Sequence, residues 1–159
     1  MKKAPLLSLA IQYADLRLKE TASRRQIRRW VKAALTHPAN LTIRFVDAAE
    51  GRSLNHAFRQ KNKATNVLTF RYDALPPQTS PNRQDSGSPV QADIILCTDV
   101  ILAEAKAQGK TPAAHLAHLI IHGVLHAQGH DHETETEAGK METLETAILS
   151  RFRIADPYA

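Results

Sequence analysis

The stretch HLAHLIIHGVLHAQGHDH, residues 115–132, holds six of the eight histidines in the chain. Three of them fit the pattern H-x-x-x-H-x-x-G-x-x-H, which places His122, His126 and His132 around Gly129. Residues four apart on an α-helix lie one turn apart on the same face, so the first two can bind one metal ion. Glycine accepts the left-handed conformation that ends a helix, so the chain can turn back and bring the third histidine to that ion. Three protein ligands leave one position open, as in catalytic zinc sites.

The remaining polar residues of this stretch are weaker candidates. His118 lies one turn before His122, where a fourth ligand is possible, but we expect it to support a ligand or to contact a substrate. Asp131 either orients a ligand histidine or faces water. His130 falls outside the ligand spacing.

Gly123 directly follows the first ligand histidine. Zinc proteases with the H-E-x-x-H motif carry a glutamate at this position as the general base. Glycine has no such group, which disfavours a peptidase without excluding it. Phosphodiester cleavage instead needs a metal that polarises oxygen and a cation that stabilises charge on phosphate, and an arginine suits the second role.

The rest of the chain predicts strands and helices in mixed order. Period-two and continuous apolar patterns predict strands at 6–13, 41–48, 66–72 and 92–98. The segment 73–91 is rich in proline and serine and predicts a long exposed loop. The pattern indicates an α/β (α+β) fold, with one domain over residues 1–159 and a mixed four-stranded sheet covered by about five helices.

Five segments predict those helices. One begins after Ser23 and a short one spans 51–61, while a third is capped by Thr98 or Asp99 and closed by Gly109. The fourth runs from Pro112 to about Gln128, and the last begins at Thr134. The apolar stripe of the last helix is expected to consist of Met141, Leu144, Ile148 and Phe152.

The charge is +5 at pH 7 and the pI is about 9.6, which favours polyanionic partners. Arg24, Arg25, Arg28, Arg29 and Lys32 lie on one predicted helix, either as a solvated face or as a nucleic-acid contact.

The single cysteine, Cys97, excludes an intrachain disulfide and is expected to be buried on a strand. No apolar run reaches the roughly 20 residues of a membrane span. The beginning of the chain resembles a strand more than a signal peptide, so we expect a cytoplasmic protein.

Several motifs together resemble the YbeY family, bacterial endoribonucleases of rRNA maturation. HGVLHAQGHDH is similar to the family signature H-G-x-L-H-L-x-G-Y-D-H, and LNHAFRQKNKATNVLTF to L-N-x-x-x-R-x-K-x-x-x-T-D-V-L-S-F. ADIILC resembles the family's G-D-I-x-I strand, and METLETAIL and DPYA its closing helix and tail. Departures from the family pattern are Asn66 for aspartate, Thr69 for serine, Ala92 for glycine, Ala127 for leucine and His130 for tyrosine.

The resemblance implies one Zn²⁺ ion per chain, bound by His122, His126 and His132, with Arg59 as the catalytic arginine beside it. The expected substrate is single-stranded RNA, with rRNA and the ribosome or its small subunit as partners, and neither membrane nor DNA. The candidates for RNA binding are Arg24, Arg25, Arg28, Arg29, Lys61 and Lys63. Asn66 lacks the charge of the usual aspartate, which puts any acid role at that position in doubt.

Three functions therefore compete. The first is a zinc-dependent endoribonuclease specific for single strands, acting in maturation of the 3′ end of 16S rRNA and in ribosome quality control. The second is a metallopeptidase or another zinc hydrolase, suggested by the protease-like histidine spacing. The third is a ribosome-assembly factor in which the metal is mainly structural.

Overall fold

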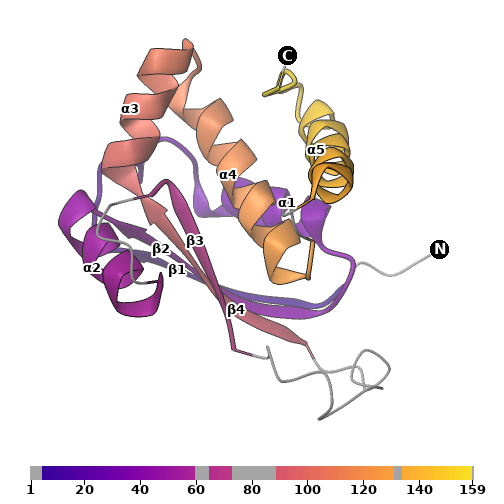
Figure 1. The fold of residues 1–159 in the computed structure, drawn as a ribbon, viewed down its shortest axis with the longest axis horizontal. Coiled ribbons are helices and arrows are strands. Elements are labelled where there is room, and N and C mark those ends of the chain that lie inside the picture. Colours follow the sequence, from indigo (N-terminus) through magenta and orange to yellow (C-terminus); the bar gives the residue numbers. More distant parts are fainter. Residues whose placement is uncertain (1–4, 60–64, 73–88, 131–133, 159) are drawn as a thin grey trace.

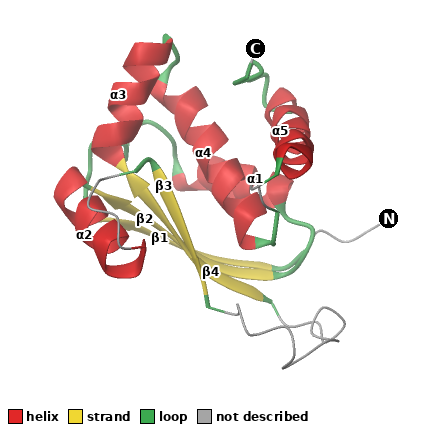
Figure 2. Ribbon diagram, viewed as in Figure 1, coloured by secondary structure: helices red, strands yellow, loops and turns green. Residues whose placement is uncertain are grey.

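The computed structural model describes residues 5–59, 65–72, 89–130 and 134–158, without the side chains of Phe58 and Arg59. These residues form four strands and five helices (Figures 1 and 2), which confirms the predicted fold class. In chain order they are β1 (Leu7–Tyr13), α1 (Arg24–Ala34), β2 (Ala39–Val46), α2 (Ala48–Arg59), β3 (Val67–Arg71), β4 (Val90–Cys97), α3 (Thr98–Gln108), α4 (Pro112–Ala127) and α5 (Glu135–Ser150).

The strands form one mixed sheet in the order β1-β2-β4-β3. The first three in this order are parallel, and β3 runs antiparallel to β4 at the edge of the sheet. Ile43 of β2 lies between Ile11 of β1 and Ile94 of β4, so apolar residues form rows across the sheet. These rows provide a continuous apolar surface for the helices.

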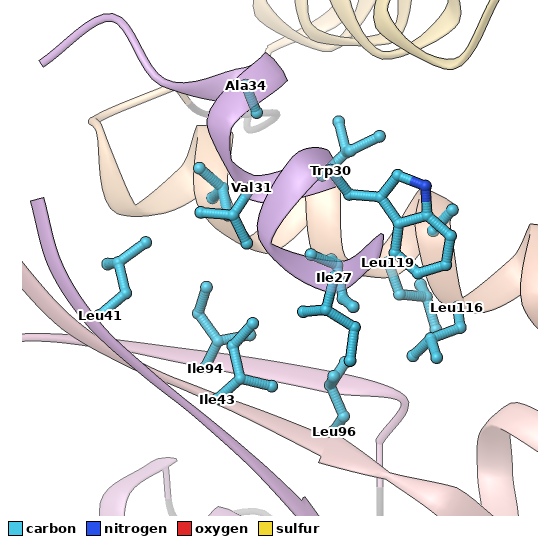
Figure 3. Close-up of a cluster of buried hydrophobic side chains, with 14 of the residues drawn as sticks. Ile27, Trp30, Val31, Ala34, Leu41, Ile43, Ile94, Leu96, Leu116 and Leu119 are labelled. Carbon is cyan, nitrogen blue, oxygen red and sulfur yellow. The ribbon is translucent and has the colours of Figure 1, made fainter. Parts of the chain in front are cut away.

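The larger hydrophobic core lies between this surface and α1 and α4. Figure 3 shows Ile27 and Val31 of α1 on the side of that helix that faces Ile43 and Ile94 of the sheet, while the ring of Trp30 lies toward α4. All five side chains are at most 3% exposed. Leu116 and Leu119 of α4 belong to the same cluster, so the histidine helix is fixed against both α1 and the sheet.

The opposite face of the sheet carries a smaller cluster. Val46, Leu68, Ile95 and Cys97 are buried there, with Leu54 of α2 packed against them. The cysteine is 1% exposed, and its burial on a strand was predicted. Neighbouring residues of β4 belong to different clusters because successive strand side chains point to opposite faces of the sheet.

The predicted starts of two elements were wrong. The second helix begins at Ala48 rather than 51, because the side chain of Asp47 accepts a hydrogen bond from the backbone N–H of Glu50 at 2.9 Å and starts the helix early. Val90 and Gln91, predicted to lie in the loop, begin β4 by pairing with β2. The rest of that loop prediction lies mostly outside the described residues.

The prediction that Thr98 or Asp99 caps α3 was also wrong. The capping residue is Cys97, without a side-chain hydrogen bond. The carboxylate of Asp99 instead accepts a hydrogen bond from the backbone N–H of Ala48 at 2.6 Å and pairs with Arg17 at 2.7 Å. Asp99 therefore anchors the beginning of α2 rather than its own helix.

In the described part of the chain, no helix combines the length and apolar character needed to cross a membrane.

Candidate metal centre

The two ends of helix α4 agree with the predicted roles of Pro112 and Gly129, and Thr111 adds a cap that was not predicted. The Thr111 hydroxyl accepts a hydrogen bond from the backbone N–H of Ala114 at 3.1 Å, and Pro112 occupies the first turn. At the other end Gly129 has a φ of 100°, a conformation that suits glycine. Gln128 donates to the carbonyl of Ala34 at 2.7 Å, which ties this end of α4 to α1.

Gly123 marks the side of α4 that faces the sheet. A Cβ atom at this position would lie 3.0 Å from Ile94 Cγ2 and 3.5 Å from Thr69 Oγ1. A larger side chain would therefore separate the helix from β3 and β4. The glutamate of a zinc protease is absent here for a packing reason, because this fold has no space for it.

His122 is held by a carboxylate from the neighbouring helix. Its Nδ1 lies 2.7 Å from Oε1 of Glu145, which is buried in the middle of α5. An ionised carboxylate only accepts hydrogen bonds, so Nδ1 carries the proton and Nε2 is the nitrogen that a metal would bind.

His126 has the same arrangement with a different acceptor. Its Nδ1 lies 3.0 Å from the backbone carbonyl oxygen of His130, which the turn at Gly129 brings back toward the helix. A carbonyl oxygen cannot donate, so this ring is also protonated on Nδ1. The rings of His122 and His126 lie nearly parallel, with centroids 6.4 Å apart and an interplanar angle of 19°.

This donor set fits zinc. Neutral imidazoles that donate one N–H to a carboxylate or carbonyl group and coordinate through the other nitrogen are typical of zinc sites. Across residues 5–59, 65–72, 89–130 and 134–158, no group of three or more His, Cys, Asp or Glu residues could hold a metal. The third predicted ligand, His132, and Asp131 lie outside the described residues.

His118 contacts the same carboxylate as His122. Its Nε2 lies 3.4 Å from Glu145 Oε1 and 3.1 Å from the hydroxyl of Tyr158. Burial opposes the ionisation of Glu145, but hydrogen bonds from His118, His122 and Tyr158 outweigh it and lower the pKa of this carboxyl to about 2. Glu145 is therefore a buried anion that three side chains stabilise.

A second histidine–carboxylate pair lies further toward the beginning of α4. Nε2 of His115 is 2.9 Å from Oε1 of Glu104 on α3, and the amide of Asn66 donates to the same oxygen at 3.0 Å. An aspartate at 66 would place a second carboxylate beside Glu104. Asparagine supplies a donor instead, which gives this departure from the family pattern a structural reason.

A hollow opens beside His122 between α4, α5 and the C-terminal segment. Its lining consists of His122, Ala138, Met141, Glu142, Glu145 and Tyr158. One metal-ligand candidate is thus accessible from the side of α5.

The arginines of α1 make contacts within the protein. Arg24 donates to the carbonyl of Ile11 at 3.4 Å, and Arg28 to that of Leu7 at 3.2 Å, so both cover the outer edge of β1. The guanidinium of Arg29 lies over the ring of Phe152. Arg25 is exposed.

The candidate catalytic and RNA-binding residues between α2 and β3 are only partly described by the structure. Arg59 is the last residue of α2, but its side chain is outside the description, as are Lys61 and Lys63. The strand that follows this segment, β3, packs against α4.

Glu145 was not among the residues predicted from the sequence. Leu144 was predicted in the buried stripe of α5, but Leu144 is 39% exposed and Glu145 is fully buried. The signal was present, because Glu145 lies four residues after Met141 and three before Ile148, as a member of the buried face must. A carboxylate on an apolar helix face indicates a buried partner, and the histidines of α4 supply it.

Comparisons with known proteins identify the family of the chain. The family model described as Endoribonuclease YbeY matches residues 9–153. The chain belongs to the YbeY family. YbeY proteins named as endoribonucleases from Herminiimonas arsenicoxydans and Janthinobacterium sp. (strain Marseille) are 52% and 51% identical to it. The matches cover 96% of this chain in both cases, and 95% and 94% of the two relatives.

A solved structure shares the fold. The solution structure of TM1509 from Thermotoga maritima matches with a TM-score of 0.54 and 22% identity, over 91% of each chain. At this level of identity the match shows that the two chains share a fold.

Proposed function

We propose that the protein is a single-strand-specific, zinc-dependent endoribonuclease. It acts in the cytoplasm on rRNA, in maturation of the 3′ end of 16S rRNA and in ribosome quality control. The observation that carries the proposal is the pair of histidines on α4, each with Nδ1 bound to an acceptor, in a chain of the YbeY endoribonuclease family.

The proposal assigns three roles to residues of the chain: metal binding, orientation of the ligand rings, and stabilisation of charge on the phosphate. His122, His126 and His132 would hold the zinc ion, which would supply Lewis acidity for cleavage of a phosphodiester bond. Glu145 and the carbonyl of His130 keep the first two rings in the orientation and tautomer for binding. Arg59 stabilises the negative charge that develops on the phosphate.

The geometry also separates this chemistry from that of a peptidase. The position of the protease glutamate is filled by Gly123 against Ile94. The carboxylate of Glu145 contacts His122, but it accepts a hydrogen bond from that ring and is buried, so it is poorly placed as a base. Arg59 and the metal remain the groups suited to a phosphate ester.

Cleavage of a single-stranded RNA by tag-free, zinc-loaded protein tests the proposal. We expect cleavage to fall at least about 100-fold in His122→Ala and Arg59→Ala, and to persist in His56→Ala. His56 is an exposed histidine of α2 and serves as the matched control.

Other outcomes identify the competing functions. Equal cleavage by all variants would assign the activity to a contaminant. Chelator-sensitive turnover of a peptide library would indicate a peptidase. Normal rRNA processing in cells that carry a folded ligand variant would favour an assembly factor with a structural metal.

A further inference from the structure

The C-terminal segment after α5 returns to the histidine helix. The carboxylate of Asp156 accepts hydrogen bonds from the backbone N–H of Tyr158 at 2.8 Å and from the hydroxyl of Thr146 at 3.3 Å. Lys110, between α3 and α4, donates to the carbonyl of Pro157 at 3.4 Å. These contacts fix the position of Tyr158 from two sides, although the residue lies next to the end of the chain.

Tyr158 uses this position to bind Glu145. Its hydroxyl donates to Oε2 at 2.7 Å, while Oε1 of the same carboxylate accepts from His122 Nδ1 at 2.7 Å. The two oxygens of one buried carboxylate are thus shared between the C-terminal segment and a candidate metal ligand. Burial and the bond to Glu145 both raise the pKa of the Tyr158 hydroxyl, so it remains protonated and donates.

His118 completes the arrangement. Its ring meets that of Tyr158 edge-on, with centroids 5.4 Å apart, and its Nε2 donates to the tyrosine hydroxyl. Within the described residues, His118 Nδ1 is buried without a hydrogen-bond partner, so this ring contacts its polar neighbours through Nε2. His118 therefore supports Tyr158 and Glu145 through Nε2, and this nitrogen is engaged by them rather than by a metal.

A glutamate carboxylate turns easily about its last side-chain bond, since that torsion has broad minima. A donor on Oε2 restricts this rotation and fixes the direction in which Oε1 faces His122. We propose that Tyr158 is a positioning residue for the metal ligand His122, acting through Glu145 with support from His118. The inference rests on the metal centre of the proposed function and assigns the C-terminal segment a part in it.

The test compares two tyrosines that each donate to a carboxylate. Tyr158→Phe keeps the ring and removes the hydroxyl beside the site. Tyr72→Phe removes the same group from a bond to Asp93 on the opposite face of the sheet, and serves as the matched control. The full-length protein is used for both.

The first readout is the long-range ¹H–¹⁵N NMR spectrum of the histidines in metal-free protein. We expect His122 to be protonated on Nδ1 in the parent and in Tyr72→Phe, and to show a mixture of tautomers in Tyr158→Phe. The second readout is zinc affinity, measured by competition with a chelator. It should fall about three- to tenfold in Tyr158→Phe, below the effect of losing an outer partner outright, and stay unchanged in Tyr72→Phe.

A double-mutant comparison separates positioning from general loosening of the tail. In a Glu145→Gln background, Tyr158→Phe should cause no further loss of zinc affinity. An equal loss in both backgrounds, or an unchanged His122 spectrum, would overturn the proposal. A raised KM for RNA with unchanged zinc affinity and spectrum would also overturn it, because Tyr158 would then contact substrate.

The NMR measurement requires neither zinc nor RNA. A parent protein that cleaves no RNA would remove the proposed function while leaving the tautomer of His122 measurable. The two failures are therefore distinguishable.

Discussion

Two histidine–glutamate pairs lie along helix α4, and they are built in opposite ways. In the pair of His122 and Glu145 the carboxylate is buried, with 1% of its side chain exposed, while the histidine is 24% exposed. In the pair of His115 and Glu104 the histidine is buried at 4% and the carboxylate is 33% exposed. In the first pair the buried Glu145 orients the accessible ring of His122. In the second pair the buried residue is the histidine, His115.

The nitrogens differ as well. His122 uses Nδ1 toward its carboxylate, whereas His115 uses Nε2. In His122 the carboxylate contacts Nδ1, so a metal would bind Nε2. In His115, on the same helix, the carboxylate itself contacts Nε2. The proposed metal ligand His122 thus differs from His115 in which member of the pair is buried and in which ring nitrogen the carboxylate occupies.

The largest effect should come from removing the two histidines in turn. His122→Ala should weaken zinc binding by more than the roughly 10–100-fold typical of outer partners, because a ligand is lost. His115→Ala should leave zinc affinity within about threefold and lower stability instead, by roughly 1–3 kcal/mol. Chelator competition and urea unfolding measure the two quantities. Equal zinc affinities in the two variants would break the comparison.

The next effect concerns the two carboxylates. Glu145→Gln should reduce zinc affinity about 10–100-fold, since an amide is a weaker acceptor for the Nδ1 proton of His122. Glu104→Gln should leave zinc affinity unchanged, because the partners of Glu104 among the described residues are His115 and Asn66. The same competition assay applies. A loss in Glu104→Gln as large as that in Glu145→Gln would show that the pairs act as one network.

A smaller effect is expected from the packing that places α4 on the sheet. Gly123→Ala should destabilise the protein by about 1–3 kcal/mol, because the new Cβ meets Ile94 at 3.0 Å. Gly139→Ala, in α5, meets nothing within 4 Å and should stabilise by roughly 0.5–1 kcal/mol. Urea unfolding compares them. A neutral Gly123→Ala would mean that β4 yields easily and that the absence of glutamate has no packing reason.

Sequence patterns predicted what local spacing determines. Ser23 and Thr134 begin their helices as expected, Pro112 lies in the first turn of the histidine helix, and Gly129 ends that helix. The mixed sheet and its covering helices followed from the order of the patterns.

The rest depends on partners far apart in the chain. Asp99 was expected to cap its own helix but binds Ala48, 51 residues earlier. Glu145 was overlooked because its partner, His122, lies on another helix. Spacing cannot say which nitrogen of a histidine faces its partner, and that choice separates His122 from His115.

The smallest effect concerns an exposed carboxylate, as a contrast to buried Glu145. The hydrogen bond from Arg17 holds the pKa of Asp99 below its usual value, helped by the backbone N–H of Ala48. Its contribution to stability is therefore complete above the usual value near 3.8 and is lost as the pH falls through the lowered pKa. Asp99→Asn should remove this acid-dependent part, less than about 1 kcal/mol for such an exposed pair. Unfolding measured from pH 5 to pH 2 checks it, and identical pH profiles for parent and variant would contradict the assignment.

Elemental analysis of tag-free protein tests the central claim most directly. The account predicts about one zinc per chain in the parent and in His115→Ala, and almost none in His126→Ala. A parent without metal, or a His126→Ala variant that keeps its zinc while His115→Ala loses it, would contradict the metal centre on α4.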